Sequence, residues 1–392
     1  MKTLNTRRQE SHRKLATRLP LLIPGFIALA AGIAAGLSRL GWDGLSSSPL
    51  DLAHLHAPLM IAGFFGTVIG LERAVALGRW PAFFSPLLSG LGSLLLIAGV
   101  FPASGAAMIF GGSLVFLAAT TWVTLIQPVF HMAILLVGAA SLMAANLAWF
   151  FGASIETVLP AWMAFLVLTI VGERLELSRL HPVDPVAKAI FAGILTVYIA
   201  SVALASFGLP AASAVMGLCL TAMAIWLIFF DIARNTVRQK GLPRFIAVCL
   251  LTGYGWLALG GGIWMVWSGL PGLITGPAYL YDAALHAVFL GFVLAMVFGH
   301  APIILPAVTT LAVPFHGAFY LHVVLLEASL ALRIAADFLA DDGLRLAGSL
   351  GNALTVAVFI ANTVFAVRRG VAAKAGRPLR TPSPNLAKAP KP

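Results

Sequence analysis

Residues 55–73 read LHAPLMIAGFFGTVIGLER, and this stretch carries the pattern from which the fold can be inferred. An apolar run begins beside a histidine, contains glycines at short intervals and ends at the charged pair Glu72 and Arg73. A helix of about 20 predominantly apolar residues spans the hydrocarbon core of a bilayer. Together with the residues that follow to position 78, the stretch is therefore predicted to be a membrane span.

The composition extends this prediction to the whole chain. Of its 392 residues, 60% are hydrophobic and only 10% are charged, whereas soluble domains carry about 25% charged residues. The first apolar run is longer than the core of a signal peptide, so it is counted as a retained helix. The sequence predicts an all-α polytopic membrane protein of about twelve transmembrane helices, at 21–40, 55–78, 83–101, 104–125, 129–151, 157–172, 186–207, 210–230, 244–267, 281–305, 314–337 and 344–367.

The basic residues orient these helices. Nearly all of the 25 Lys and Arg residues fall in the two tails and after the second, sixth and eighth runs, which share one side of the membrane. Because cytoplasmic loops are enriched in Lys and Arg, both termini are predicted to be cytoplasmic. This topology accounts for the net charge of +11 without a nucleic-acid partner. We expect a basic tail at 1–20, a transmembrane domain at 21–367 and a disordered tail at 368–392, in the lipid bilayer of a bacterial-type inner membrane.

Short similarities recur at every fourth run. The second run ends GLER at 70–73, the sixth ends GER at 172–174 and the tenth ends GH at 299–300. The second and tenth runs also begin alike, with LHA at 55–57 and at 285–287. Repeats indicate architecture, so the twelve helices are predicted to form three pseudo-repeated units of four. Chance is the alternative, since a glycine followed by a charged residue commonly ends a membrane helix.

Three histidines, His54, His56 and His286, lie toward the outer ends of the second and tenth runs. Ionisable groups inside a membrane tend to face a protein interior, a cavity or a ligand. Two residues along a helix is a rotation of about 200°, so His54 and His56 cannot both face one partner. One face runs from His56 through Gly63 and Gly70, and it permits the close approach of a helix or a flat macrocycle. His56 is therefore the better inward candidate.

The pairing of two histidines at one depth points to a cofactor. Two imidazoles on different helices are what axial ligation of a haem requires, and apolar walls accept the macrocycle. We hypothesise that His56 and His286 bind haem b, with His54 as the alternative ligand on the second helix. The competing interpretation is that these histidines extend to the interface and bond to backbone or water.

A second group of histidines, His300, His316 and His322, lies toward the cytoplasmic face. His300 is on nearly the same helix face as His286 and about 21 Å from it along the axis. The spacings are compatible with a second metal or haem site, copper included, although they match no established metal signature. Interfacial histidines with structural hydrogen bonds are the alternative.

Charged residues and prolines complete the candidate features. The Glu-Arg pairs at 72–73 and 173–174 are expected to pair across helices or to bind an anionic group. Asp282 lies one turn before His286 and is a candidate to orient that imidazole. Three prolines are expected to end the tenth helix or to start the eleventh: Pro302, Pro306 and Pro314.

The arrangement resembles subunit I of haem-copper oxidases and the related NnrS family. The motifs that carry the resemblance are AHLHA at 53–57, LHA at 285–287 and GHAP at 299–302. NnrS proteins are multi-pass, haem- and copper-associated membrane proteins linked to nitric oxide stress, and the resemblance implies that His56 and His286 match the axial ligands of a low-spin haem. The predicted sixth and seventh helices carry no histidine, where oxidases place their copper ligands. The resemblance to NnrS is therefore retained and oxidase activity is not expected.

These features together predict an NnrS-like membrane haem protein, with copper as a further metal, that acts with a redox partner in electron transfer or in the nitric oxide response. A secondary transporter of a small solute is the competing class, because it shares twelve spans, repeats and interrupted helices. Transporters place polar groups near the midplane, however, whereas most polar groups here lie near the leaflet faces. A structural or assembly protein without haem is a third class. The chain has no phosphate-binding loop, nucleophile elbow or HExxH motif, so the sequence does not decide whether it is an enzyme.

Overall fold

The computed structural model describes residues 2–42, 52–177, 183–269 and 279–375, with side chains described between 17 and 373. Within these ranges every regular element is helical and no strand occurs. Twelve of the helices are long and apolar enough to cross a membrane. The predicted fold class is therefore confirmed.

The first half of the chain contains six spans, and the second of them is built from several consecutive helical segments. A short 3-10 turn, one α-helical turn, a π-helical segment and a longer α-helix together cover Ala53–Leu77. The elements are α1 (Lys2–Ser38), η2 (Ala53–Leu55), α2 (His56–Pro58), η3 (Leu59–Phe65), α3 (Gly66–Leu77), η4 (Trp80–Phe83), α4 (Phe84–Ala98), α5 (Pro102–Ile126), α6 (Phe130–Phe150) and α7 (Ile155–Leu177).

The second half contains the other six spans, and the tenth is again composite. An α-helix, a π-helical segment and a second α-helix together cover Tyr279–Thr309. The elements are α8 (Pro185–Ser206), α9 (Pro210–Phe230), α10 (Ala233–Thr236), α11 (Leu242–Gly269), α12 (Tyr279–His286), η6 (Ala287–Leu294), α13 (Ala295–Thr309), α14 (Phe319–Leu339) and α15 (Asp342–Ala375).

The local sequence explains where several of these helices begin and end. Proline opens α5, α8 and α9, at a position where the missing N–H needs no partner within the helix. Asp184 caps α8, because its carboxylate accepts hydrogen bonds from the backbone N–H groups of Val186 and Ala187. Helices α3 and α4 stop at Gly78 and Gly99, whose φ angles of 67° and 66° suit glycine.

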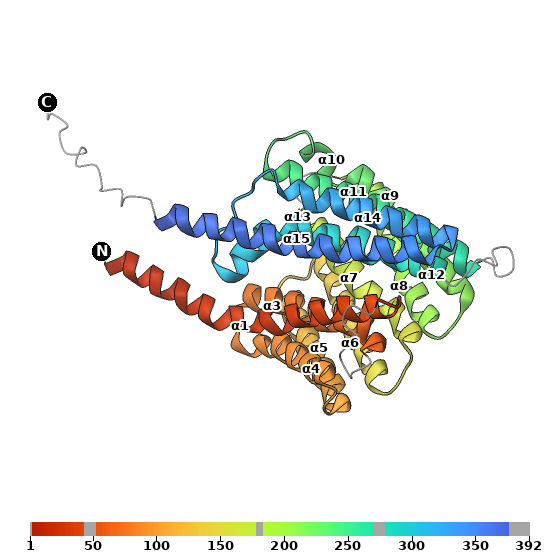
Figure 1. Cartoon of the computed structure of the whole chain (residues 1–392), viewed down its shortest axis with the longest axis horizontal. Helices are drawn as coiled ribbons and strands as arrows, with labels where there is room; N and C mark the ends of the chain where they lie inside the picture. Colours follow the sequence, from red (N-terminus) through yellow and green to blue (C-terminus); the bar gives the residue numbers. More distant parts are fainter. Residues whose placement is uncertain (1, 43–51, 178–182, 270–278, 376–392) are drawn as a thin grey trace.

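The helices pack mainly against their neighbours in sequence, with α4 on α5, α6 on α7, α9 on α11 and α14 on α15. Contacts from α1 to α13 and α15 join the two ends of the chain. In Figure 1 the start of α1 and the end of α15 extend from the same end of the bundle. The two terminal helices therefore begin and end on one side, as an even number of spans requires.

Burial distinguishes the central spans from the peripheral ones. Within an apolar stretch of 18 residues in each span, 72% of the residues are buried in α7, whereas only 28% are buried in α8 and 22% in α15. Large apolar side chains on the outer surfaces of the bundle are widely exposed, for example Leu125 at 76% and Phe207 at 83%. Exposed apolar surface of this extent suits contact with lipid rather than water. The structure is thus that of a multi-pass integral membrane protein.

The structure differs from the sequence predictions by four residues or more at one end of five helices, and one of these is α7, which ends at Leu177 and not at 172. Helix α1 includes the predicted basic tail, and α15 continues past 367 to Ala375. The prediction that Pro302 and Pro306 end the tenth helix is wrong, because α13 continues through both to Thr309. Proline is tolerated inside membrane helices, since neighbouring groups satisfy the carbonyls that it leaves free. The eleventh span starts at Phe319, five residues beyond Pro314.

Candidate functional site

His56 and His286 face each other across the interface between the second and tenth spans. His56 opens α2, and His286 is the last residue of α12. The centroids of the two imidazole rings are 6.4 Å apart, and the ring planes differ by only 21°. The two histidines at equal depth are therefore brought together, which the sequence pattern had predicted from the paired LHA motifs.

Hydrogen bonds fix one nitrogen of each ring. Nδ1 of His56 lies 2.7 Å from the carbonyl oxygen of Gly32 in α1, and Nδ1 of His286 lies 2.8 Å from the carbonyl oxygen of Asp282. Because a carbonyl only accepts, each Nδ1 carries the proton and each Nε2 retains its lone pair. Within the described residues neither Nε2 has a hydrogen-bond partner. Each ring thus has a metal-binding nitrogen that no hydrogen bond to a described residue occupies.

His54 takes no part in this pair. Its side chain is exposed, whereas that of His56 is half-buried. The two residues point in different directions because they are two positions apart at the start of the span. Of the two sequence candidates on the second span, His56 is the one that faces the interior.

A π-helical segment follows each histidine of the pair. Segment η3 begins three residues after His56, and η6 begins directly after His286. π-Helical turns are rare and occur frequently at functional sites. The similarity of the second and tenth spans therefore includes an irregular backbone that the short sequence repeat did not predict.

The glycine face of the second span contacts a helix and not the histidine pair. A Cβ atom added at Gly63 or Gly70 would lie 2.6 or 2.7 Å from the hydroxyl oxygen of Ser93 or Ser85, both in α4. Of the two partners that the glycine face was expected to permit, a helix or a macrocycle, Gly63 and Gly70 therefore contact a helix. The π-helical turns of η3 change the helical phase between His56 and these glycines.

A network of charged groups lies behind His286. The guanidinium of Arg333 donates to the Asp282 carboxylate, with Nη2 2.6 Å from Oδ2, and it also bonds Ser349. The other carboxylate oxygen of Asp282 lies 3.4 Å from Nδ1 of His286. Arg345 extends the network, 3.9 Å from Asp282. Asp282 therefore lies where it can orient His286, as its position one turn earlier suggested.

Sequence reasoning identified Asp282 as a partner of His286 but not the rest of this network, which includes a further buried acid. Asp337 is fully buried, and its carboxylate oxygen lies 3.0 Å from Nε of Arg345. Two arginines and two aspartates thus share a small volume next to the histidine pair. The available signal was the presence of Arg333 inside a span, since an intramembrane arginine requires an acidic partner.

In the second group, His316 and His322 both contact the ring of Phe319 and interact electrostatically with each other, whereas His300 has a different set of charged neighbours. Nδ1 of His300 bonds the carbonyl of Met296 in its own helix. His322 is buried among aromatic rings, with Nδ1 3.3 Å from the Asn362 amide nitrogen, while Nε2 of both His316 and His322 is buried without a hydrogen-bond partner. In the part of the chain that the structure describes, no three His, Cys, Asp or Glu side chains are gathered so that they could hold a metal. A second metal site remains a prediction.

A buried ion pair lies in another part of the bundle. The guanidinium of Arg174 donates two hydrogen bonds, of 2.9 and 3.0 Å, to the carboxylate of Asp231 at the end of α9. The hydroxyl of Tyr254 in α11 and the backbone N–H of Ala233 donate to the same carboxylate, at 3.1 and 2.7 Å. Arg174 therefore pairs across helices, which was one of the two expectations for the Glu-Arg motifs. Its acidic partner was not identified from the sequence.

Comparison with known families accounts for nearly the whole membrane domain. Residues 18–368 match the family described as "Domain of unknown function (DUF8744)". The chain belongs to this family. No curated protein matches the chain. The match covers both composite spans, so the histidine pair of this DUF8744 protein lies within the family domain.

Proposed function

We propose that this DUF8744 protein is an integral membrane haem protein in which His56 and His286 are the axial ligands of the iron. The observation that carries the proposal is the arrangement of the two imidazoles, with centroids 6.4 Å apart and nearly parallel planes. The haem b assignment, the NnrS-like role and the cytoplasmic position of the termini are parts of the same proposal.

The distance between the rings can be compared with that of two imidazoles on one metal ion. A metal–nitrogen bond to histidine is about 2.0 Å long, and an imidazole centroid lies about 1.1 Å from its ring nitrogen. Two imidazoles on opposite sides of one ion therefore have centroids about 6 Å apart. Ligands in adjacent positions would bring the rings closer together. The observed 6.4 Å fits opposite, axial positions.

The donor chemistry also fits haem iron. Both imidazoles hold a proton on Nδ1 through a backbone carbonyl, which leaves Nε2 as the ligand atom. Asp282 and Arg333 fix the orientation of His286 from behind. The side chain of His286 is 17% exposed, although its neighbours Ala283, Ala284 and Ala287 are fully buried. The ring is thus not sealed by protein atoms.

Ligation by two histidines favours electron transfer as the role of the proposed haem. A haem with two axial protein ligands carries single electrons and has no open iron position for a substrate. The predicted sixth and seventh helices lack histidine, so the copper ligands of an oxidase are missing from them. Electron transfer to or from a redox partner is therefore the function that these residues support best. A role in the nitric oxide response rests on the resemblance to NnrS.

Copper is the weaker part of the proposal. His300, His316 and His322 offer imidazoles, and two of them have a free Nε2. A copper site there would require further ligands or a movement that brings the rings together, because the described residues form no three-ligand group. Metal analysis of the purified protein tests this part separately from the haem.

The experiment is absorbance spectroscopy of protein purified from cells that are supplied with haem precursor. We expect a Soret band that shifts on dithionite reduction and sharp α and β bands of a low-spin haem. His56→Ala and His286→Ala are each expected to lose these bands. His54→Ala is the matched control, since it removes an exposed histidine two residues from His56 and is expected to keep them. Folded wild-type protein without a Soret band would refute the proposal.

A further inference from the structure

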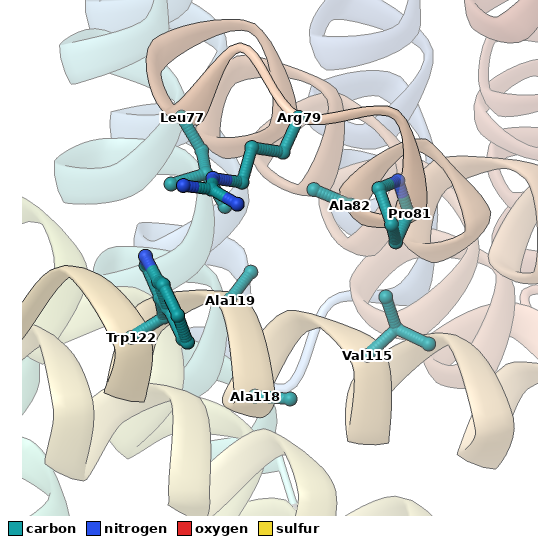
Figure 2. A pocket seen from close by; sticks show the side chains of 8 residues that line it. All are labelled: Leu77, Arg79, Pro81, Ala82, Val115, Ala118, Ala119 and Trp122. Carbon is teal, nitrogen blue, oxygen red and sulfur yellow. The ribbon is translucent and has the colours of Figure 1, made fainter.

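A cavity of about 210 Å³ lies on the outside of the bundle, where the second span passes into the third. Figure 2 shows it between the turn that carries Arg79 and Pro81 and the side of α5 that carries Ala119 and Trp122. None of these residues belongs to the histidine pair or to its charged network. The cavity is therefore a separate feature, and its chemistry can be considered independently of haem.

Small side chains create the hollow. Ala82 on η4 and Ala118 and Ala119 on α5 leave space between the larger side chains of Leu77 and Trp122. The walls are almost wholly apolar. An apolar cavity of about 150 Å³ already accommodates a molecule the size of benzene. This cavity is therefore large enough for part of a hydrocarbon chain.

One cation lies at the edge of the apolar walls. The guanidinium carbon of Arg79 lies 5.1 Å from the centroid of the Trp122 ring, and this cation–π contact holds the charge beside the cavity. Arg79 is exposed and forms no ion pair with any described residue. Its charge is thus available to an anion from outside the protein.

The position of the cavity matches the boundary between membrane and water. Leu77 ends the second span, Trp80 begins the third, and Trp122 lies in the last turns of α5. Trp80 and Trp122 are 73% and 49% exposed. Tryptophan and arginine are the residues that accumulate at this depth of a membrane protein. An occupant would have a hydrocarbon part in the bilayer and an anionic part at its surface.

We propose that this cavity binds an anionic phospholipid, with its phosphate on Arg79 and the first part of an acyl chain against Ala82, Ala118 and Ala119. The charge favours this occupant over a zwitterionic lipid, whose own cation would oppose Arg79. Apart from Arg79, the only polar side-chain group of the lining is the indole N–H of Trp122, a single donor, and the other lining side chains are apolar and suit an acyl chain. A phospholipid is therefore the amphiphile that the lining fits.

Native mass spectrometry of the full-length protein tests the proposal, with phosphatidylglycerol and phosphatidylcholine of identical acyl chains as probes. Wild-type protein is expected to retain at least one phosphatidylglycerol more tightly than phosphatidylcholine. Arg79→Gln is expected to weaken that binding about tenfold, because it removes a charge-assisted hydrogen bond. Arg234→Gln is the matched control, since Arg234 is also exposed but bonds the carbonyl of Phe229 in another part of the chain.

A second variant tests the hydrocarbon part of the site. Ala118→Phe fills the cavity from an exposed position, so the fold is expected to be retained, with an unchanged melting temperature. This variant is expected to weaken the binding of phosphatidylglycerol as much as Arg79→Gln does. Unchanged binding in both variants would overturn the proposal. Loss in Ala118→Phe alone, or tighter binding of a long-chain quinone than of phosphatidylglycerol, would also overturn it, because the occupant would then not be an anionic lipid.

Discussion

Removing the carboxylate of Asp231 is expected to destabilise the protein severely. The side chains of Arg174 and Asp231 are 4% and 2% exposed, so neither charge is solvated by water. In Asp231→Ala the guanidinium of Arg174 stays buried without its counter-charge. Tyr254 and the backbone N–H of Ala233 lose their acceptor as well. Breaking a buried ion pair by removing one partner costs about 3–5 kcal/mol, mainly because the remaining charge is uncompensated.

The same reasoning predicts that removal of both charges is much less harmful. Replacing a buried ion pair with apolar residues of similar volume is often neutral or stabilising. Arg174→Met combined with Asp231→Leu is therefore expected to recover most of the free energy that Asp231→Ala loses. Tyr254→Phe removes one hydrogen bond to a charged group and is expected to cost about 1.5–3 kcal/mol.

Unfolding in SDS, followed by circular dichroism in mixed micelles, measures these free energies for the wild type, both single variants and the double variant. Arg174→Met and Asp231→Leu as single variants complete the cycle with the double variant and separate the pairwise interaction from the loss of each side chain. If Asp231→Ala unfolds within about 1 kcal/mol of the wild type, the buried-pair argument is refuted. A double variant that is less stable than Asp231→Ala would refute the explanation by uncompensated charge.

Three further outcomes follow from close contacts. Gly36→Ala places a Cβ atom 2.7 Å from Nδ1 of His56 and is expected to displace that ring. The Soret absorbance of the haem that we propose should then fall, while circular dichroism stays unchanged. Gly291→Ala places a Cβ atom against Cγ and Cβ of Trp256. Overpacking of this kind costs about 1–3 kcal/mol, so a lower unfolding midpoint is expected and an unchanged one would contradict the prediction. Trp256→Phe removes the indole N–H that donates to Oε2 of Glu327 over 2.7 Å. Because Oε1 of Glu327 is already buried without a partner, the variant is expected to lose about 1.5–3 kcal/mol of stability in the SDS unfolding titration.

The number of spans could be predicted because a membrane helix carries apolar side chains both where it faces lipid and where it faces protein, so each span is a continuous apolar run in the sequence. Each helix of the bundle corresponds to one apolar run, and most ends agree within a few residues. Apart from that of α7, the ends that differ are at prolines and at the two termini, where the apolar signal does not decide whether the helix continues. Pro302 and Pro306 stay inside α13 because a membrane helix tolerates proline where neighbouring groups satisfy the carbonyls that the missing N–H groups leave free.

The histidine pair was accessible to sequence reasoning, whereas its surroundings were not. The LHA motifs of the second and tenth spans place His56 and His286 at one depth, and the structure brings their rings to 6.4 Å. The partners Asp231 and Asp337 depend on which helices are neighbours, which a single sequence does not record. Whether the glycines contact a helix or a macrocycle could not be decided from the sequence, because the spacing was counted with a period of 3.6 residues through a segment that is π-helical.

The two π-helical segments have a consequence for insertions and deletions. A π-helical turn holds one residue more than an α-helical turn, so deleting one residue within 59–65 would let the second span close into a regular helix. His56 would then keep nearly its present direction relative to the glycines that fix the span against α4, because the deletion removes only the extra residue of the wide turn. The same holds for a deletion within 287–294 and the direction of His286 relative to α13. A deletion between His56 and Gly70 in the regular α-helical part of the span would instead rotate His56 by about 100° relative to those glycines. The two wide turns are thus the places where these spans can lose a residue and still keep the imidazoles opposite each other.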